Sequence, residues 1–382
     1  MIFRVIVLLV LALTPARQPS AAEGVPISSE LADLGRILFF DPRFSADRTM
    51  SCATCHDPAR AFTDSRDNTV NGAASLGNDG TTLGDRNAPA LTYAAFTPAF
   101  RKTNAGAYRG GFFHDGRATD LTAQAQQPVT SPQEMALSPA GVQERLLEEG
   151  AYVDAFQRLF GADALDSPET ALQSFATAIA AFETSADFAS FDSKYDRYLR
   201  GEAILTREED LGRRVFFSSL SNCGRCHLVD QREDRQREIF TGFEYYNIGV
   251  PPNRQLRKAT HTIAGQVDTG LAANPTVSGS GHEGKFRVPS LRNVAVTGPY
   301  MHNGVFGELK TAIIFYNRFL VDNEASRTNP ETGEPWGEPE IAATVEHGLL
   351  GEGQPLSDAR VRQLEAFLRT LTDRRYEHLL ER

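Results

Sequence analysis

The chain has 382 residues, a formal net charge of −10 at pH 7 and a sequence pI of about 5.4. A protein this acidic is a poor candidate for binding nucleic acid or an anionic membrane, because both need a positive protein surface. The length suffices for two or three domains with cores of their own.

Residues 1–22 have the pattern of a secretory signal peptide. Arg4 precedes an apolar run, and the small residues Ser20, Ala21 and Ala22 follow it. The run is much shorter than the roughly 20 residues that cross a bilayer, so we expect cleavage near Ala22 rather than a membrane anchor. Loss of this leader, with its two arginines, makes the net charge −12 and places the mature protein in an exported, oxidising compartment.

Two helices of the same kind are predicted, one in each half of the chain. The first, ELADLGRILFF, follows Ser29 as a start signal, and the second, DLGRRVFF, follows Thr206-Arg-Glu-Glu209, which has the form of a capping box. Both contain Leu-Gly-Arg and end in Phe-Phe, at residues 34–40 and 211–217, shortly before a cysteine pair. Self-similarity of this kind indicates a duplicated unit.

Two further helices are predicted from apolar residues at helical spacing. Segments 168–183 (PETALQSFATAIAAFE) and 357–371 (SDARVRQLEAFLRTL) each carry these residues on one face, which we expect to face the core. Segments 71–89 and 274–284 are rich in Gly, Asn, Pro and Thr and are expected to be too polar for the core. Loops of this length are uncommon unless they are functional.

All four cysteines fall in two Cys-x-x-Cys-His units, SCATCH and NCGRCH. Disulfides are the default in an exported protein, and two redox-active dithiols or one zinc site with four thiolates are further alternatives. None of them explains a histidine directly after each pair, whereas covalent haem attachment does. We therefore predict two c-type haems, held by Cys52, Cys55, His56, Cys223, Cys226 and His227, with the two histidines as iron ligands.

The second axial position of each iron decides the function. An iron with two protein ligands only passes electrons, whereas an iron with an open face can activate a small oxygen species. No histidine lies between residues 57 and 113, so His114 is the local candidate in the first half. A lone histidine is more often a hydrogen-bonded structural residue than a ligand.

The fold class predicted from these features is mainly α, with two cytochrome c-like haem domains related by duplication and connected through long loops. After the signal peptide, the first domain covers residues 23–190 and the second covers residues 191–382.

The chain resembles the bacterial dihaem cytochrome c peroxidase and MauG family, most closely its MauG-like branch. The similarity extends over nearly the whole mature chain and is carried by these segments: LGRILFFDPRFS, CATCHDPARAFTD, GDRNAPAL, DGRATDL, FDSKYDRYLRGE, FRVPSLRNVAVTGPYMHNGVF and AIIFYN. The resemblance implies a periplasmic location.

For the first haem, the resemblance implies an open iron. Family members that need reductive activation cap this iron with a histidine from a loop that corresponds to residues 68–77 here, and NTVNGAASLG contains none. The family's distal residues correspond to Glu134 as acid/base, Gln124 as its hydrogen-bond partner and Pro128 as a wall of the pocket. The alternative for Glu134 is a structural one, a Ser-x-x-Glu capping box that begins at Ser131.

For the second haem, electron-transfer members of the family supply a methionine. Aligned through LKTAIIFYN, that position is Tyr316 here, as in the MauG-like branch. Phenolate is a hard anionic donor that favours ferric iron. Met301 and His302 in PYMHNG are the rival ligands, and either one is alternatively structural.

The family also implies a calcium ion between the haems. Its protein ligands correspond to Asn87 and to the carbonyl oxygens of Thr297 and Pro299, and oxygen donors with several waters suit calcium. The alternative is that Asn87 caps a turn and that residues 297–299 simply form one.

The expected function is reduction of hydrogen peroxide at the His56 haem, with the second haem storing or relaying an oxidising equivalent and a small cytochrome c or copper protein as donor. The alternative is a maturase that oxidises tryptophans of a partner protein, and a third possibility is a plain electron carrier. By the resemblance, the maturase needs two tryptophans at the positions that hold His114 and Ser221 here, and Trp336 matches neither. His114 is alternatively a bridge between the haems or an iron ligand.

Overall fold

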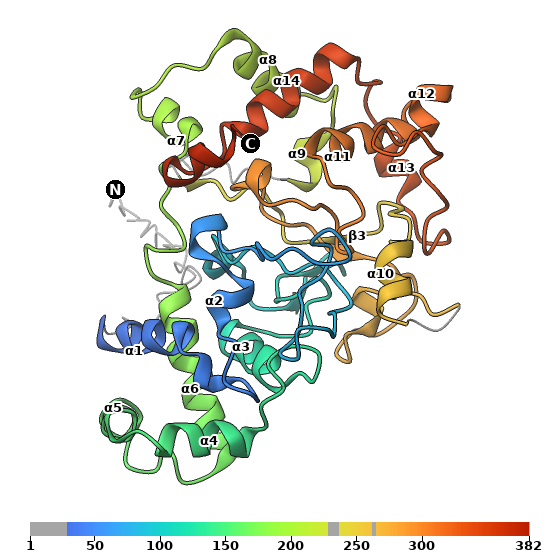
Figure 1. Ribbon diagram of the computed structural model, residues 1–382. Coiled ribbons are helices and arrows are strands. Elements are labelled where there is room, and N and C mark those ends of the chain that lie inside the picture. The colour runs from blue at the N-terminus through green and yellow to red at the C-terminus, as the bar shows by residue number, and fades with distance from the viewer. Residues whose placement is uncertain (1–28, 228–236, 262–264, 382) are drawn as a thin grey trace, which may run out of the picture.

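The computed structural model describes residues 29–227, 237–261 and 265–381, and the described chain is mainly helical (Figure 1). Its α-helices are α1 Ser29–Phe40, α2 Cys52–Cys55, α3 Leu121–Thr130, α4 Pro139–Leu147, α5 Gly150–Phe160, α6 Pro168–Glu183, α7 Lys194–Leu199, α8 Arg207–Phe216, α9 Cys223–Cys226, α10 Arg254–Ala259, α11 Leu309–Phe315, α12 Glu324–Arg327, α13 His347–Leu350 and α14 Asp358–Arg369. The predicted signal peptide lies outside the described residues.

Strands contribute little to the described chain. Two short antiparallel pairs are formed by β1 Arg101–Lys102 with β2 Tyr108–Arg109, and by β3 Tyr245–Tyr246 with β4 Phe286–Arg287. The mainly α prediction is therefore confirmed, and much of the remaining chain is loop and turn.

In the N-terminal half, α1 packs against α6, and both lie in the lower part of Figure 1. The contact depends on Gly35, because a Cβ atom there would lie 1.8 Å from the carbonyl oxygen of Ala178. Around this point, α1 buries Leu34, Leu38 and Phe39 in the apolar core of this half.

In the C-terminal half, α8 packs against α14 in the same manner, in the upper part of Figure 1. A Cβ atom at Gly212 would lie 1.8 Å from the carbonyl oxygen of Gln363. The core of this half includes Val361, Leu364 and Phe367 from α14. The two Leu-Gly-Arg helices therefore use their glycine in equivalent contacts.

The helix boundaries follow the predicted signals closely. Segment 168–183 is α6, α14 begins after its N-cap Ser357, and Thr206 caps α8 with Glu209 in a capping box, as predicted. Ser29 is the first residue of α1.

The expectation that segment 71–89 is too polar for the core is wrong in part. Ala73, Ala74 and Leu83 are buried and form a small apolar cluster with Val70 and with Leu256 of α10. Small apolar side chains between polar ones are enough for this, because a residue from the other half of the chain covers them.

No helix of the described ranges combines the length and the apolar character needed to cross a bilayer.

Candidate functional site

A single cavity of about 910 Å³ extends from one Cys-x-x-Cys-His unit to the other. Every site residue predicted from the sequence lines it: Cys52, Cys55, His56, Asn87, His114, Gln124, Pro128, Glu134, Cys223, Cys226, His227, Thr297, Pro299 and Tyr316. The fold thus brings together residues that are up to about two thirds of the chain apart in sequence.

The two histidines of the motifs are positioned by the same pattern of helix and hydrogen bonds. Each follows a one-turn helix, α2 or α9, and its backbone N–H donates to the carbonyl oxygen of the first cysteine, at 3.0 Å in both cases. The Nδ1 atom of His56 lies 3.1 Å from the carbonyl oxygen of Phe62, and that of His227 lies 3.0 Å from the carbonyl oxygen of Phe240. Nδ1 is therefore occupied, and Nε2 of each ring is left for a metal.

Burial also keeps these imidazoles neutral, as an iron ligand must be. Desolvation lowers the pKa of His56, and it lowers the pKa of His227 to about 4. A neutral ring with Nδ1 fixed by a carbonyl fits axial ligation of a haem iron.

The cysteines fit thioether attachment and none of the alternatives. All four are free, which excludes disulfides between them in this structure. Burial raises the pKa of Cys55 to about 11 and that of Cys226 to about 12, so neither is a reactive low-pKa thiol. Within the described ranges, no group of three or more His, Cys, Asp or Glu side chains is placed to hold a metal ion, so the four-thiolate zinc site is not formed.

Gln124, Pro128 and Glu134 line the cavity near the first motif. Helix α3 carries the first two, and its N-cap is Asp120, whose side chain accepts from the Ala123 N–H at 2.8 Å. Glu134 is half-buried in the turn that follows α3, and the pKa of Cys55 responds to its charge. Burial raises the pKa of Glu134, and a hydrogen bond with Ser131 opposes that rise.

The capping-box alternative for Glu134 is wrong. No helix begins at Ser131, because residues 131–135 form a turn in which the Glu134 N–H donates to the Ser131 carbonyl oxygen at 3.0 Å. The next helix, α4, begins at Pro139 and is capped by Ser138. A local Ser-x-x-Glu pattern has no capping role where the chain turns instead of entering a helix.

The loop without histidine, residues 68–77, is fixed in place beside Glu134. Asn68 Nδ2 donates to the Ala74 carbonyl oxygen at 2.7 Å, and a Cβ atom at Gly77 would lie 2.5 Å from the Gln133 carbonyl oxygen. Just beyond the loop, the Asn78 N–H donates to the Glu134 carbonyl oxygen at 2.7 Å. The loop therefore supports the turn that presents Glu134 to the cavity.

Tyr316 lies at the C-terminal end of α11, beside the second motif. Burial raises the pKa of its phenol above the usual range, and the charges of Cys226 and Cys223 add to that rise. The rival His302 has other neighbours: its ring stacks on Phe286 with centroids 3.5 Å apart, and its pKa responds to Asp268 and His114 rather than to the cysteines. Met301 also lines the cavity.

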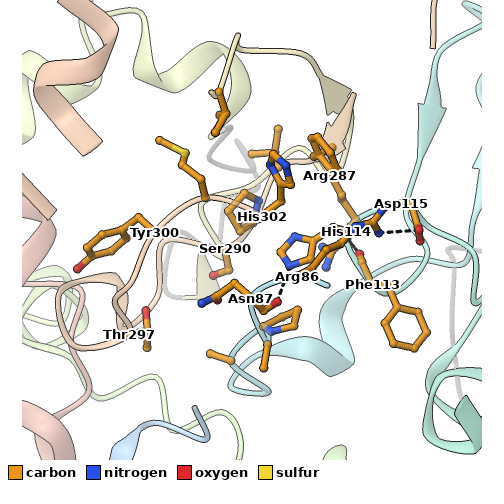
Figure 2. Close-up of a pocket in the computed structure, with 18 of the residues that line it drawn as sticks. Arg86, Asn87, Phe113, His114, Asp115, Arg287, Ser290, Thr297, Tyr300 and His302 are labelled. Carbon is orange, nitrogen blue, oxygen red and sulfur yellow. Dashed lines mark hydrogen bonds and ion pairs between the residues drawn. The ribbon is translucent and has the colours of Figure 1, made fainter. Parts of the chain in front are cut away.

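His114 and Asn87 both line the cavity and are hydrogen-bonded to each other, as Figure 2 shows. His114 Nε2 donates to the Asn87 carbonyl oxygen at 2.9 Å, and the Asn87 N–H donates to the His302 carbonyl oxygen at 2.8 Å. Burial lowers the pKa of His114 to about 4. With its Nε2 engaged, His114 is a hydrogen-bonded, neutral residue in this structure.

Of the three residues predicted for calcium, Asn87 and Pro299 lie beside Gly72, and Thr297 lines the same cavity. The Asn87 side-chain N–H donates to the Gly72 carbonyl oxygen at 3.4 Å, and a Cβ atom at Gly72 would lie 3.5 Å from Cδ of Pro299. In the described part of the chain, no hydrogen bond engages Asn87 Oδ1 or the carbonyl oxygens of Thr297 and Pro299. This donor set of neutral oxygens fits a hard cation.

Ser221, at a position where a maturase needs tryptophan, and Trp336 have different surroundings. Ser221 lines the cavity next to the second motif, and its hydroxyl donates to the Val215 carbonyl oxygen at 2.7 Å. Trp336 is buried in a separate apolar cluster, where Nε1 donates to the Ser326 carbonyl oxygen at 2.8 Å, and it does not line the cavity.

Among the ionisable residues of the cavity that the sequence did not indicate as site residues, Arg86 and Glu183 bear most on the argument. Arg86 forms ion pairs with Asp115 at 2.7 Å and Asp268 at 2.6 Å, and contacts this distant in sequence leave no local signal. Glu183 was assigned only to the core helix 168–183. Its signal was its spacing, because it continues the buried face of Phe175 and Ile179 at intervals of four residues.

Comparisons with known proteins place the chain in a family. Residues 29–204 match the Di-haem cytochrome c peroxidase family. The methylamine utilization protein MauG of Paracoccus denitrificans is 51% identical over 95% of this chain and 93% of its own length. Cytochrome c551 peroxidase of Pseudomonas aeruginosa is 33% identical over 78% of this chain and 74% of its own length.

A solved structure agrees with these relatives. The diheme peroxidase BthA from Burkholderia thailandensis superposes with a TM-score of 0.81 at 33% identity and covers 94% of this chain and 90% of its own. The family's haem groups fit the free cysteines of this cavity and the two histidines whose Nδ1 atoms are already engaged. The chain therefore belongs to the dihaem cytochrome c peroxidase and MauG family, and it is a haem oxidoreductase with two haems.

Proposed function

We propose that this protein is a periplasmic dihaem peroxidase that reduces hydrogen peroxide at the haem held by Cys52, Cys55 and His56. Residues 23–190 and 191–382 would each form one cytochrome c-like haem unit, and the equivalent glycine contacts of α1 and α8 support a duplication. The observation that carries the proposal is the half-buried acid Glu134 in the cavity beside the first motif, where loop 68–77 contributes no histidine.

The chemistry divides between the haem and the protein. When bound, the haem supplies an iron that binds peroxide and accepts its oxidising equivalents. Glu134 supplies the proton transfer: its carboxylate oxygen takes a proton from one peroxide oxygen and returns it to the other, so that water leaves instead of hydroxide. Gln124 orients this carboxyl group, and Pro128 closes the wall of the pocket.

Tyr316 is the proposed second ligand of the His227 haem. It is the candidate whose ionisation responds to Cys226 and Cys223, whereas His302 responds to Asp268 and His114. Burial alone keeps the phenol protonated, but a bound metal cation reverses that preference and stabilises the phenolate. A calcium ion on Asn87, Thr297 and Pro299 is proposed on the basis of their unengaged oxygen atoms.

The second candidate function is a maturase that oxidises tryptophans of a partner protein, and the 51% identity to a MauG protein favours it. The positions that the maturase would use weigh against it. Serine has no ring that is oxidised at an accessible potential, so Ser221 provides no exit for oxidising equivalents. His114 is neutral and hydrogen-bonded, and Trp336 lies outside the cavity. We therefore assign the oxidising equivalents to a small redox protein, a cytochrome c or a copper protein.

One experiment separates the two functions. The ferric protein and hydrogen peroxide are incubated with a reduced small cytochrome or copper protein and, separately, with unprocessed methylamine dehydrogenase. Turnover of the reduced donor without formation of a crosslinked tryptophan cofactor is the expected result. Formation of that cofactor at a rate comparable with donor oxidation would overturn the peroxidase assignment.

A further inference from the structure

Glu183, the last residue of α6, is a buried carboxyl group. Its side chain is 3% exposed, and among the residues that the structure describes none makes a hydrogen bond to its Oε2 atom. Within the described ranges, no ion pair involves this carboxyl group either. Burial is the only cause that shifts its pKa, and it raises that pKa to about 8.

The carboxyl group faces the first haem site. Glu183 lines the cavity together with Ile179 and Cys52, and its charge acts on the Cys52 thiol, whose pKa it raises further. It therefore lies close enough to Cys52 for its charge to affect that thiol, and it is distinct from the distal acid Glu134.

The elements packed against α6 offer no compensating charge. Helix α1 carries Glu30, Asp33 and Arg36, and all three are exposed to solvent. Helix α3 contains no ionisable side chain, and in α4 Glu144 is exposed while Arg145 pairs with Glu148. In the described ranges, these helices thus bring neither an opposite charge nor a hydrogen-bond donor to Glu183 Oε2.

Ionisation of a carboxyl group buried in this way is unfavourable in free energy, because no cation or hydrogen-bond donor replaces the hydration that it has lost. Its protonation state therefore depends on any charge that appears or disappears in the cavity. We propose that Glu183 is the proton-exchanging group of the first haem site: it takes up one proton from solvent when one electron is added there, and releases it when the electron leaves. The net charge of the site is then unchanged by reduction.

This inference rests on haem attachment at Cys52 and Cys55, which is part of the proposed function, but it does not depend on peroxide as the substrate. Glu134 is a further carboxyl group near this haem whose pKa burial raises, so its contribution has to be separated from that of Glu183. Asp64 also lies near Cys55, but it pairs with Arg66 at 2.6 Å, and although burial raises the pKa of Asp64, the hydrogen bonds of Arg66 lower it.

The test is a spectroelectrochemical titration of the purified dihaem protein over a pH range centred on the pKa of about 8. We expect the midpoint potential of the first haem to fall as pH rises, with a slope of at most about 59 mV for each tenfold change in proton activity. Glu183→Gln should remove most of this slope. Glu169→Gln, at an exposed position of the same helix, should keep it, and Glu134→Gln measures the share of the distal acid.

A second readout identifies the group directly. Infrared difference spectra between the oxidised and reduced protein should contain a protonated-carboxyl band that shifts in D2O and is missing in Glu183→Gln. If Glu183→Gln fails to incorporate haem, the wild-type spectrum still decides, because absence of any such band contradicts the proposal. A dihaem Glu183→Gln protein with the wild-type slope would also overturn it. Loss of peroxide turnover with an intact slope would count against the peroxidase assignment alone.

Discussion

Two histidines at equivalent places show how single residues prepare this site. His56 and His227 each give Nδ1 to a phenylalanine carbonyl, and both phenylalanines, Phe62 and Phe240, have a φ of 57°. Such a left-handed conformation is unfavourable for a bulky residue and persists only where the surroundings impose it. Its benefit is that each carbonyl fixes the ring and strengthens Nε2 as a donor to a metal.

Glu134→Gln should slow the reaction of the ferric protein with hydrogen peroxide by about 10²- to 10⁴-fold, the usual contribution of a positioned acid/base. Because burial raises the pKa of Glu134, the wild-type rate should increase with pH as that carboxyl group ionises, and the variant should lose this dependence. Rapid mixing followed by haem absorbance measures both effects.

The control for this change is Glu144→Gln, at an exposed position of α4, which should react like the wild type. The wild-type protein should need no prior reduction, since loop 68–77 has no histidine to cap the iron. A lag that only pre-reduction abolishes would contradict the open site.

Tyr316→Phe should change the low-spin haem signal in absorption and electron paramagnetic resonance spectra, because the variant lacks the phenolate oxygen. The matched control is Tyr376→Phe, which removes a buried hydroxyl that has no hydrogen-bond partner and lies outside the cavity. Spectra that are the same in both variants and the wild type would exclude tyrosine as the ligand and leave Met301 and His302.

At the scale of elements, the two Leu-Gly-Arg helices determine how closely the main helices of each half pack together. Gly35 and Gly212 allow α1 and α8 to approach the backbone of α6 and α14 so closely that no Cβ atom fits. Helix packing of this kind fixes the position of the segment that follows, and in both halves that segment leads to a haem motif.

Gly35→Ala and Gly212→Ala should therefore each destabilise the protein by about 1–3 kcal/mol or more, the usual cost of an overpacked core. The new methyl group would overlap with a backbone carbonyl oxygen. A backbone group cannot relieve the overlap by changing rotamer, as a side chain could. The midpoint of chemical denaturation measures the loss. Gly150→Ala is the control, because nothing lies within 4 Å of its Cβ position and its φ is not in the left-handed range. Equal midpoints for all three variants would contradict the packing argument.

The local elements could be predicted from the sequence, but the long-range contacts could not. Helix α6 was predicted to its ends because helical periodicity and caps are local signals. The small core under segment 71–89 needs Leu256, and the Ser131–Glu134 pattern has two meanings that only the path of the chain separates. The site residues were identified from the family resemblance. The missing hydrogen bond at Glu183 Oε2 depends on which of the described helices surround it, and the sequence does not show that.

At the scale of the whole molecule, the cavity depends on contacts between the two halves of the chain. Arg86 makes the main one: its guanidinium group bonds to both oxygens of Asp268 at 2.6 Å and to Asp115 at 2.7 Å. All three side chains are largely buried, and Figure 2 shows Arg86 and Asp115 at the edge of the cavity near His114. The charges are thus balanced only while the halves stay together.

Arg86→Met should therefore cost about 3–5 kcal/mol at neutral pH, because it removes the cation paired with the buried Asp268 carboxylate, while Asp115 keeps its pair with Arg117 at 2.8 Å. The pH dependence of the folding stability tests this ion pair more specifically than the size of the loss at neutral pH. In the wild type, burial alone would raise the pKa of Asp268, but the hydrogen bonds and charge of Arg86 lower it to about 2, below the value of about 3.9 in an unfolded chain. That stabilisation is present above pH 4 and is lost as pH falls towards 2. In the variant we expect the pKa of Asp268 to rise above its unfolded value, because burial then acts without Arg86, so the stability of the variant should increase on acidification from neutral pH. Between pH 7 and pH 4 this carboxyl group leaves the wild-type denaturation midpoint unchanged, whereas the midpoint of the variant should rise, so midpoints measured over this range separate the two proteins. Arg158→Met, which breaks an exposed pair with Glu30, should follow the wild type, because surface pairs contribute little. If Arg86→Met also followed the wild-type slope, Arg86 would not be the contact that holds the halves together.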